Sequence, residues 1–286
     1  MLATLLACGA VAGVAIAVAQ SSDDGSGPRA PRSEATLPAP DGALPRTPAA
    51  LAAELTSVVR DLRGIGWDGA KPVPREMTYL ALRDQRILRL LAARHALGDS
   101  TLALLPSDVR GEAGDTVRAR RALAAIPRSP GRLPRVRVAH AAPAAALRRY
   151  YAAAQQRFGI DWSILAAVNF VESAFGRIRS ASEAGARGPM QFLPSTWRAF
   201  GMGGSIDDPH DAILAAANLL RHDGAPRHLD RALFAYNHST AYVRAIRRFA
   251  ARMRTDQRAF LTYYAWQVYV RTGAGVRRIT GPGRLR

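Results

Sequence analysis

The sequence is poor in cysteine and in lysine, and each scarcity excludes a class of explanation. Cys8 is the one cysteine in 286 residues, so no intrachain disulfide can form and the fold must depend on its core. Lys71 is the one lysine, and it precedes a proline in GAKPVPRE, with no glycine-rich phosphate loop around it. A P-loop nucleotidase is therefore excluded.

Acidic residues are also few relative to basic ones. The chain has 40 Lys and Arg against 22 Asp and Glu, a formal net charge of +18. Such a charge suits a polyanion: nucleic acid, anionic lipid head groups or acidic cell-wall polymers. Because the arginines are spread over every segment, we expect no nucleic-acid partner, while a membrane surface and anionic wall polymers stay open as partners.

The N-terminal segment predicts where the protein acts. Residues 1–20 are small and apolar with no charged side chain, and AVA at 17–19 fits a signal-peptidase site. The segment is either a cleaved signal peptide or a retained membrane anchor, and both predict an extracytoplasmic protein, secreted or anchored at the cell wall. Residues 21–50, rich in Ser, Pro, Gly and Asp, predict a disordered linker.

The remaining sequence, in a chain that is 48% hydrophobic, predicts a mainly α fold. Apolar residues recur at helical spacing over 51–126, which predicts a small helical accessory domain of two to four helices that pack on one another or on the next domain. A proline-rich linker over 127–144 marks the boundary to a second domain.

A carboxylate occupies the inward face of a helix in the second domain. Asp161 is the expected N-cap of a helix through IDWSILAAVNFVESAF, and steps of four lead from Ile164 to Val168 to Glu172. Burial should raise the pKa of Glu172 toward neutrality, as a general acid requires. The alternative is an ordinary ion pair with Arg177 or Arg179.

Two later segments place polar side chains where a ligand could reach them. In SEAGARGPMQFLPSTW, glycines predict a tight loop, Pro189 a helix start, and Gln191 a place on the first turn of that helix. In RALFAYNHS, Tyr236 and Asn237 lie where a helix ends, so that the phenol could point into a cleft.

Taken together, these motifs resemble a known family. ES at 172–173, SEAGARGPMQFLPSTW from 182, DDPHDAILAAANLL from 207 and ALFAYN ending at 237 occur in the order and spacing of the soluble lytic transglycosylase (SLT) domain of actinobacterial type, a lysozyme-like family that cleaves peptidoglycan. The resemblance covers 145–255. It leaves 256–286 as a C-terminal extension expected to pack on the catalytic domain through an aromatic seam.

The resemblance implies an activity and a set of site residues. Glu172 would be the single catalytic acid and base that cleaves the bond between N-acetylmuramic acid and N-acetylglucosamine and forms a 1,6-anhydro end. Ser182, Gln191, Tyr236 and Asn237 would bind substrate, with Tyr236 orienting the glutamate. A hydrolase of the same fold and a non-catalytic wall-binding protein remain alternatives.

Neither a second catalytic carboxylate nor a metal centre is indicated. The acids of SIDDPHDAI read as a turn followed by a helix cap, so the substrate's own N-acetyl oxygen would stabilise the cationic intermediate. The histidines are scattered without a zinc-like spacing. We therefore expect no metal and no cofactor.

Overall fold

The computed structural model describes residues 37–126, 136–272 and 275–283. The predicted signal peptide or anchor at 1–20, with Cys8, lies outside these residues, as does the first half of the proline-rich linker. Within the described ranges, no helix has both the length and the apolar character needed to cross a membrane.

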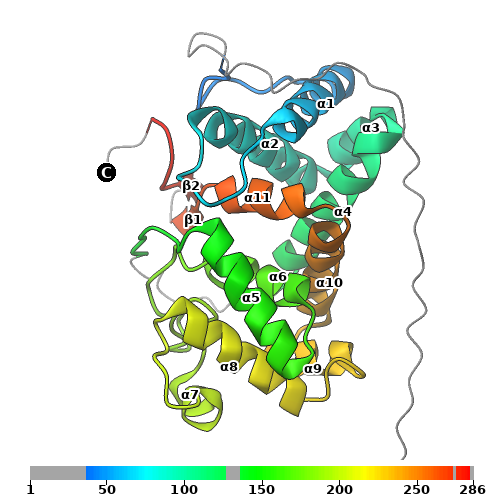
Figure 1. Cartoon of the computed structure of the whole chain (residues 1–286). Helices are drawn as coiled ribbons and strands as arrows, with labels where there is room; N and C mark the ends of the chain where they lie inside the picture. Colours follow the sequence, from blue (N-terminus) through cyan, green and yellow to red (C-terminus); the bar gives the residue numbers. More distant parts are fainter. Residues whose placement is uncertain (1–36, 127–135, 273–274, 284–286) are drawn as a thin grey trace, which may run out of the picture.

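The described part of the chain contains eleven helices and one two-stranded sheet, which confirms the predicted mainly α fold (Figure 1). The N-terminal helices are α1 (Pro48–Gly64), α2 (Arg75–Ala93), α3 (His95–Leu104) and α4 (Ser107–Ala124). They are followed by α5 (Ala144–Phe158), α6 (Trp162–Ser173), α7 (Pro194–Phe200), α8 (Pro209–His222), α9 (Leu229–Tyr236), α10 (Thr240–Thr255) and α11 (Gln257–Ala265). The sheet is an antiparallel hairpin of β1 (Tyr269–Thr272) and β2 (Gly275–Arg278), with Tyr269 opposite Arg278.

The corner between α5 and α6 is formed by a glycine that ends one helix and an aspartate that caps the next. Gly159 ends α5 in the left-handed conformation, with φ 71°, which a residue without a Cβ adopts at little cost. Asp161 then caps α6, since its side chain accepts a hydrogen bond from the Ser163 backbone N–H at 2.8 Å. This corner sets the direction of the helix that carries Glu172.

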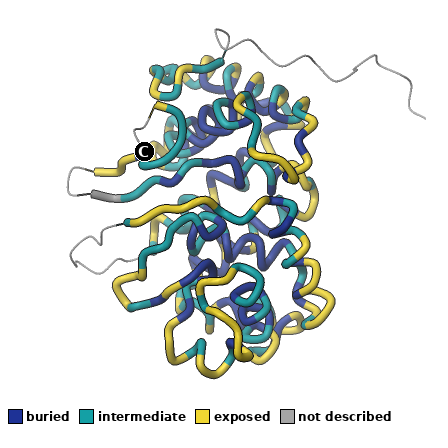
Figure 2. The backbone as a smooth tube through the Cα atoms, turned by 60° about the vertical axis from the view of Figure 1, so that its left-hand side comes forward, coloured by how far each residue is buried: buried dark blue, intermediate teal, exposed yellow. Residues whose placement is uncertain are grey.

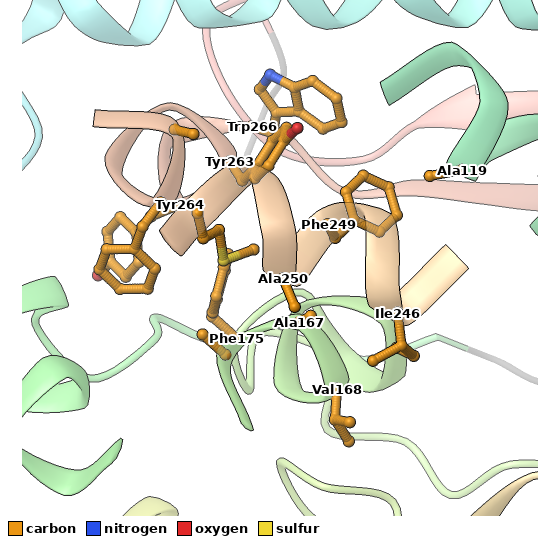
Figure 3. Packing of buried hydrophobic residues seen from close by; sticks show 14 of the residues in the cluster. Ala119, Ala167, Val168, Phe175, Ile246, Phe249, Ala250, Tyr263, Tyr264 and Trp266 are labelled. Atoms are coloured by element: carbon orange, nitrogen blue, oxygen red, sulfur yellow. The ribbon is translucent and has the colours of Figure 1, made fainter. Parts of the chain in front are cut away.

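The N-terminal helices share one continuous hydrophobic core with the rest of the chain. The main contact is between α4 and α10, where Ala119 lies near Phe249 (Figure 3). Thr116 of α4 and Tyr263 of α11 are hydrogen-bonded at 2.7 Å between their hydroxyl oxygens, in a buried position. The helices of the predicted accessory domain at 51–126 thus pack both on one another and on the following domain, and Figure 2 shows buried residues throughout both parts.

The predicted disordered linker at 21–50 extends too far. Thr47 caps α1, which already begins at Pro48. Before it, the Arg83 guanidinium donates to the carbonyl oxygens of Gly42 and Ala43, each at 2.9 Å. The prediction was wrong for residues 40–50 because composition does not reveal that a distant arginine satisfies the backbone of this segment.

The aromatic residues after α10 pack as a seam against α6 and α10. Tyr263, Tyr264 and Trp266 are buried. The Tyr263 ring stacks on Phe170 of α6 at 5.2 Å between centroids, and meets Trp266 edge to face at 4.9 Å. This packing holds the end of α6 from the side of the C-terminal segment.

Candidate active site

Glu172 is the penultimate residue of α6, and its side chain follows the inward face of the helix. Val168 and Leu165, one and two turns earlier, are fully buried, whereas Glu172 keeps part of its surface exposed. Its Oε1 accepts a hydrogen bond of 2.7 Å from the hydroxyl of Tyr242 on α10. The carboxylate therefore lies between two packed helices, on a residue that keeps part of its surface exposed.

Burial raises the pKa of Glu172 from 4.5 to about 7, while the hydrogen bond from Tyr242 opposes part of that rise. No charged side chain of the described residues contributes to the shift. Arg177 donates to the carbonyl oxygens of Ala174 and Tyr264 at 3.1 and 2.6 Å. Arg179 also donates only to backbone carbonyls. The ion-pair alternative is thus wrong, and the carboxyl group is poised to hold and release a proton near neutral pH.

The tyrosine in contact with the glutamate is Tyr242, not Tyr236 as the resemblance implied. The Tyr236 hydroxyl donates to the Met190 carbonyl at 2.6 Å, and its ring lies parallel to that of Tyr242 with centroids 6.5 Å apart. Tyr236 ends α9 and Tyr242 lies in the first turn of α10, so the short turn between these helices brings the two rings together. Tyr236 therefore fixes the loop of Met190 and supports the ring that holds Glu172.

The loop with Gln191 is a tight backbone hairpin rather than a helix start at Pro189. Arg187 and Phe192 exchange two backbone hydrogen bonds of 2.8 and 2.9 Å, and the nearest helix, α7, begins only at Pro194. Gln191 has φ 50°, and its side-chain amide donates to the Gly188 carbonyl at 3.0 Å. A helix start was predicted because proline favours that position, but the closing bond between Arg187 and Phe192 leaves no room for a helical turn.

This hairpin is attached to α6 by buried polar side chains. Asn169 donates to the Pro189 carbonyl at 2.8 Å and accepts a 2.6 Å hydrogen bond from the Tyr151 hydroxyl. Ser173, fully buried, also donates to the Pro189 carbonyl and accepts from the Gly176 backbone N–H at 2.8 Å. The serine of the ES motif thus positions the loop beside Glu172, and its hydroxyl is occupied within the protein.

Ser182 and Asn237 lie on loops of this region and make no hydrogen bond to Glu172. Ser182 is exposed, and its Oγ accepts from the Ala186 backbone N–H at 3.0 Å in the turn that leads into the hairpin. Asn237 follows α9, is half-buried, and uses its backbone N–H to bond the Leu233 carbonyl. Among the described residues, no hydrogen-bond partner occupies the Asn237 side chain, so it is available to a ligand.

One group of residues in the described ranges has the spacing of a metal site, but its oxygen atoms have structural roles. Asp208, His210 and Asp211 have possible ligand atoms within 4.8 Å of one another. Asp208 caps α8, as predicted, by accepting from the backbone N–H groups of His210 and Asp211. Asp211 accepts from Ser205 and His210. Helix capping accounts for the cluster without an ion.

The sequence analysis missed Tyr242, Asn169 and Ser173 as contributors to the site. A signal for Tyr242 existed, because it shares the buried face of α10 with Ile246 and Phe249 and its hydroxyl needs a partner there. Asn169 is likewise a polar residue on a buried face, one turn before Ser173. Their partners lie on distant segments of the chain. The sequence pattern could therefore show that each side chain needs a hydrogen bond, but not which residue is the partner.

Comparison with known proteins agrees with the motifs. No curated protein and no solved structure matches the chain. Residues 149–258 match the profile of the family described as Transglycosylase SLT domain. This range contains α6, the hairpin at 187–192 and both tyrosines around Glu172. This part of the chain is therefore similar to the transglycosylase SLT domain family, as the motifs predict, and its mainly α structure agrees with the lysozyme-like fold of that family.

Proposed function

We propose that this protein is a peptidoglycan lytic transglycosylase in which Glu172 is the single general acid and base. The observation that supports the proposal most directly is a glutamate with a pKa of about 7, bonded to one tyrosine and remote from any charged partner in the described residues. Ordinary glycosidases place a second carboxylate about 5–10 Å from the first. Here the aspartates of SIDDPHDAI have other partners: Asp208 caps α8, Asp207 pairs with Arg187, and Asp211 accepts from the Ser205 backbone N–H.

In the first step, Glu172 donates its proton to the oxygen that links C1 of N-acetylmuramic acid to N-acetylglucosamine. The C1–O bond breaks, and the released N-acetylglucosamine end carries the proton as a hydroxyl. The acetamido oxygen of the muramoyl residue closes on C1 and takes the positive charge, as in other substrate-assisted glycosidases. Because Tyr242 bonds Oε1, the second oxygen of Glu172 is the one that carries the proton.

In the second step, the Glu172 carboxylate accepts the proton of the muramoyl 6-hydroxyl. The 6-oxygen attacks C1, the acetamido oxygen leaves, and the product is a 1,6-anhydro sugar with the acetamido group restored. Glu172 ends protonated, ready for the next bond, so no water is consumed. A pKa near neutrality suits both steps of the reaction, because Glu172 must first donate a proton and then accept one.

The substrate and the site of action follow from the family. An SLT domain is a transglycosylase-type domain that acts on the glycan strands of peptidoglycan, which lie outside the cytoplasmic membrane. The apolar segment at 1–20 supports export by a signal peptide or an anchor. Ser182, Gln191, Tyr236 and Asn237 stay proposed as residues that bind the glycan, Tyr236 through the loop it holds.

The test is mass spectrometry of the fragments released from purified peptidoglycan by the wild type, Glu172→Gln and Glu183→Gln. Glu183 is an exposed glutamate in the turn after Ser182 and serves as the matched control. We expect 1,6-anhydromuramoyl ends from the wild type and the control, and none from Glu172→Gln. Reducing muramic ends would instead show a hydrolase, and no release by the wild type would favour a wall-binding protein.

A further inference from the structure

A second cleft lies between the N-terminal helices and the C-terminal hairpin, apart from the carboxylate of Glu172. It has a volume of about 610 Å³, within the range of small-ligand pockets. Its walls come from α2, α4, the end of α6, α10 and the β1–β2 hairpin. Trp266 and Phe249, both shown in Figure 3, are part of its aromatic lining.

Two arginines give this cleft its charge. Arg89 of α2 lies over the Tyr269 ring at 3.9 Å from its centroid, and Arg120 of α4 lies over Trp266 at 5.6 Å. Neither makes a hydrogen bond or an ion pair with any residue that the structure describes, and the buried Nε of Arg120 has no partner there. No acidic side chain of the described ranges lines the cleft.

The contrast with the other arginines of the same region shows that this arrangement is unusual. Arg121, the next residue, pairs with Asp99 at 2.7 Å, and Arg83 of α2 pairs with Glu54. The nearest buried acid, Asp84, affects Arg120 only through space, because its carboxylate accepts the indole N–H of Trp266 at 3.0 Å. Burial and the neighbouring charge of Arg89 lower the pKa of Arg120 to about 9. An anion in the cleft would relieve this unfavourable pair of cations.

We propose that this cleft binds the carboxylate of a peptide, and that Arg89 and Arg120 are the groups that recognise it. A planar guanidinium matches a carboxylate with two parallel hydrogen bonds. The apolar walls, formed by Phe170, Val171 and Val268 among others, suit the side chains of a short peptide. A phosphate polymer would need a longer, more exposed row of cations than these two.

The cleft and the candidate active site share structural elements. Val171 lines the cleft and precedes Glu172 on α6, while Phe249 lines the cleft two turns after Tyr242 on α10. If the proposed function is right, the occupant is a carboxylate-bearing stem peptide of the cell-wall polymer, recognised at a place separate from the glycan. This assignment of the peptide rests on the proposed function, while the anion site rests on the two arginines.

Calorimetric titration of the full-length protein at fixed ionic strength tests the assignment. The probes are a stem tetrapeptide without sugar, the same peptide with its carboxyl groups amidated, and inorganic phosphate. The variants are Arg89→Gln and Arg120→Gln, with Arg94→Gln as control, because Arg94 is exposed at the end of α2 and does not line the cleft. Circular dichroism identifies any variant that does not fold.

We expect the free peptide to bind the wild type and Arg94→Gln equally, the amidated peptide to bind at least about tenfold more weakly, and each cleft variant to lose about tenfold in affinity. Equal binding of free and amidated peptide, or unchanged binding by folded cleft variants, would overturn the proposal. Tighter binding of phosphate than of the peptide would overturn it as well. Peptide binding needs no cleavage, so this result is independent of whether Glu172 is catalytic.

Discussion

Replacing Glu172 by glutamine should stabilise the protein at neutral and alkaline pH while it removes activity. Glutamine has nearly the same shape, and its carbonyl oxygen can still accept the hydrogen bond that Tyr242 donates at 2.7 Å. The change therefore deletes the ionisation and little else. Burial disfavours the ionised form of the side chain in the folded state more than in the unfolded chain. Removal of the ionisable group should therefore increase the free energy of unfolding where Glu172 is ionised.

The direction of the pH dependence follows from the pKa of Glu172, which rises from 4.5 to about 7 on folding. Between these two values the folded state binds more protons than the unfolded chain, so the free energy of unfolding decreases as the pH rises. The decrease amounts to about 3 kcal/mol once the side chain is ionised in both states. Glu172→Gln should thus be about as stable as the wild type at pH 4 and about 3 kcal/mol more stable at pH 8.

Urea denaturation at pH 4, 6 and 8 measures this difference. Asp84 has a pKa raised by burial to about 7 and also makes the wild type pH-dependent, but it is present in both proteins and cancels in the comparison. A difference between the two proteins that is the same at pH 4 and pH 8 would refute the reasoning. It would mean that Glu172 ionises in the fold as it does in water, and the proposed acid would then be ionised when it is needed.

Two further predictions concern the groups around Glu172. Tyr242→Phe removes the hydrogen bond that favours the carboxylate, so the pKa of Glu172 should rise by about 1 and the alkaline fall in kcat/KM should move to higher pH. Tyr236→Phe is the control, because the Tyr236 hydroxyl donates to the Met190 carbonyl. An equal shift in both variants would contradict the assignment of Tyr242 as the partner of Glu172. Gly188→Ala should lower the free energy of unfolding by about 2–4 kcal/mol, because Gly188 has φ 75° and an added Cβ would lie 1.9 Å from the Ile206 carbonyl oxygen. Gly185→Ala, with φ 80° and open space around it, should cost only about 1–2 kcal/mol, and equal losses in urea denaturation would show that the contact with Ile206 is not tight.

The helices of the catalytic part could be predicted because their signals are local. Gly159 and Asp161 sit directly at the corner between α5 and α6, and the spacing from Ile164 to Glu172 places the carboxylate on the buried face. The hairpin at 187–192 could not be predicted, because it depends on contacts with residues far along the chain. Its Pro189 carbonyl is held by α6 and its Met190 carbonyl by α9.

The choice of tyrosine shows the same limit. Tyr236 and Tyr242 lie close together in the sequence and stack in the structure, so both are compatible with a phenol directed at the site. What separates them is which hydroxyl faces α6, and this depends on how α10 packs against that helix. A motif that ends at AYN includes the tyrosine that holds the loop and omits the one that holds the glutamate.

For Glu172 to stay protonated in a protein this rich in arginine, the neighbouring guanidinium groups must bond to groups other than its carboxylate. With 40 Lys and Arg, a carboxylate is readily paired, and a guanidinium at hydrogen-bond distance would lower the pKa of Glu172 and leave it ionised at neutral pH. Arg177 and Arg179, which follow Glu172 by five and seven residues, instead donate to backbone carbonyls. Those bonds tie down the chain after α6 and at the same time leave Glu172 without a cation. The segment that follows the glutamate thus favours the protonated form of the proposed acid.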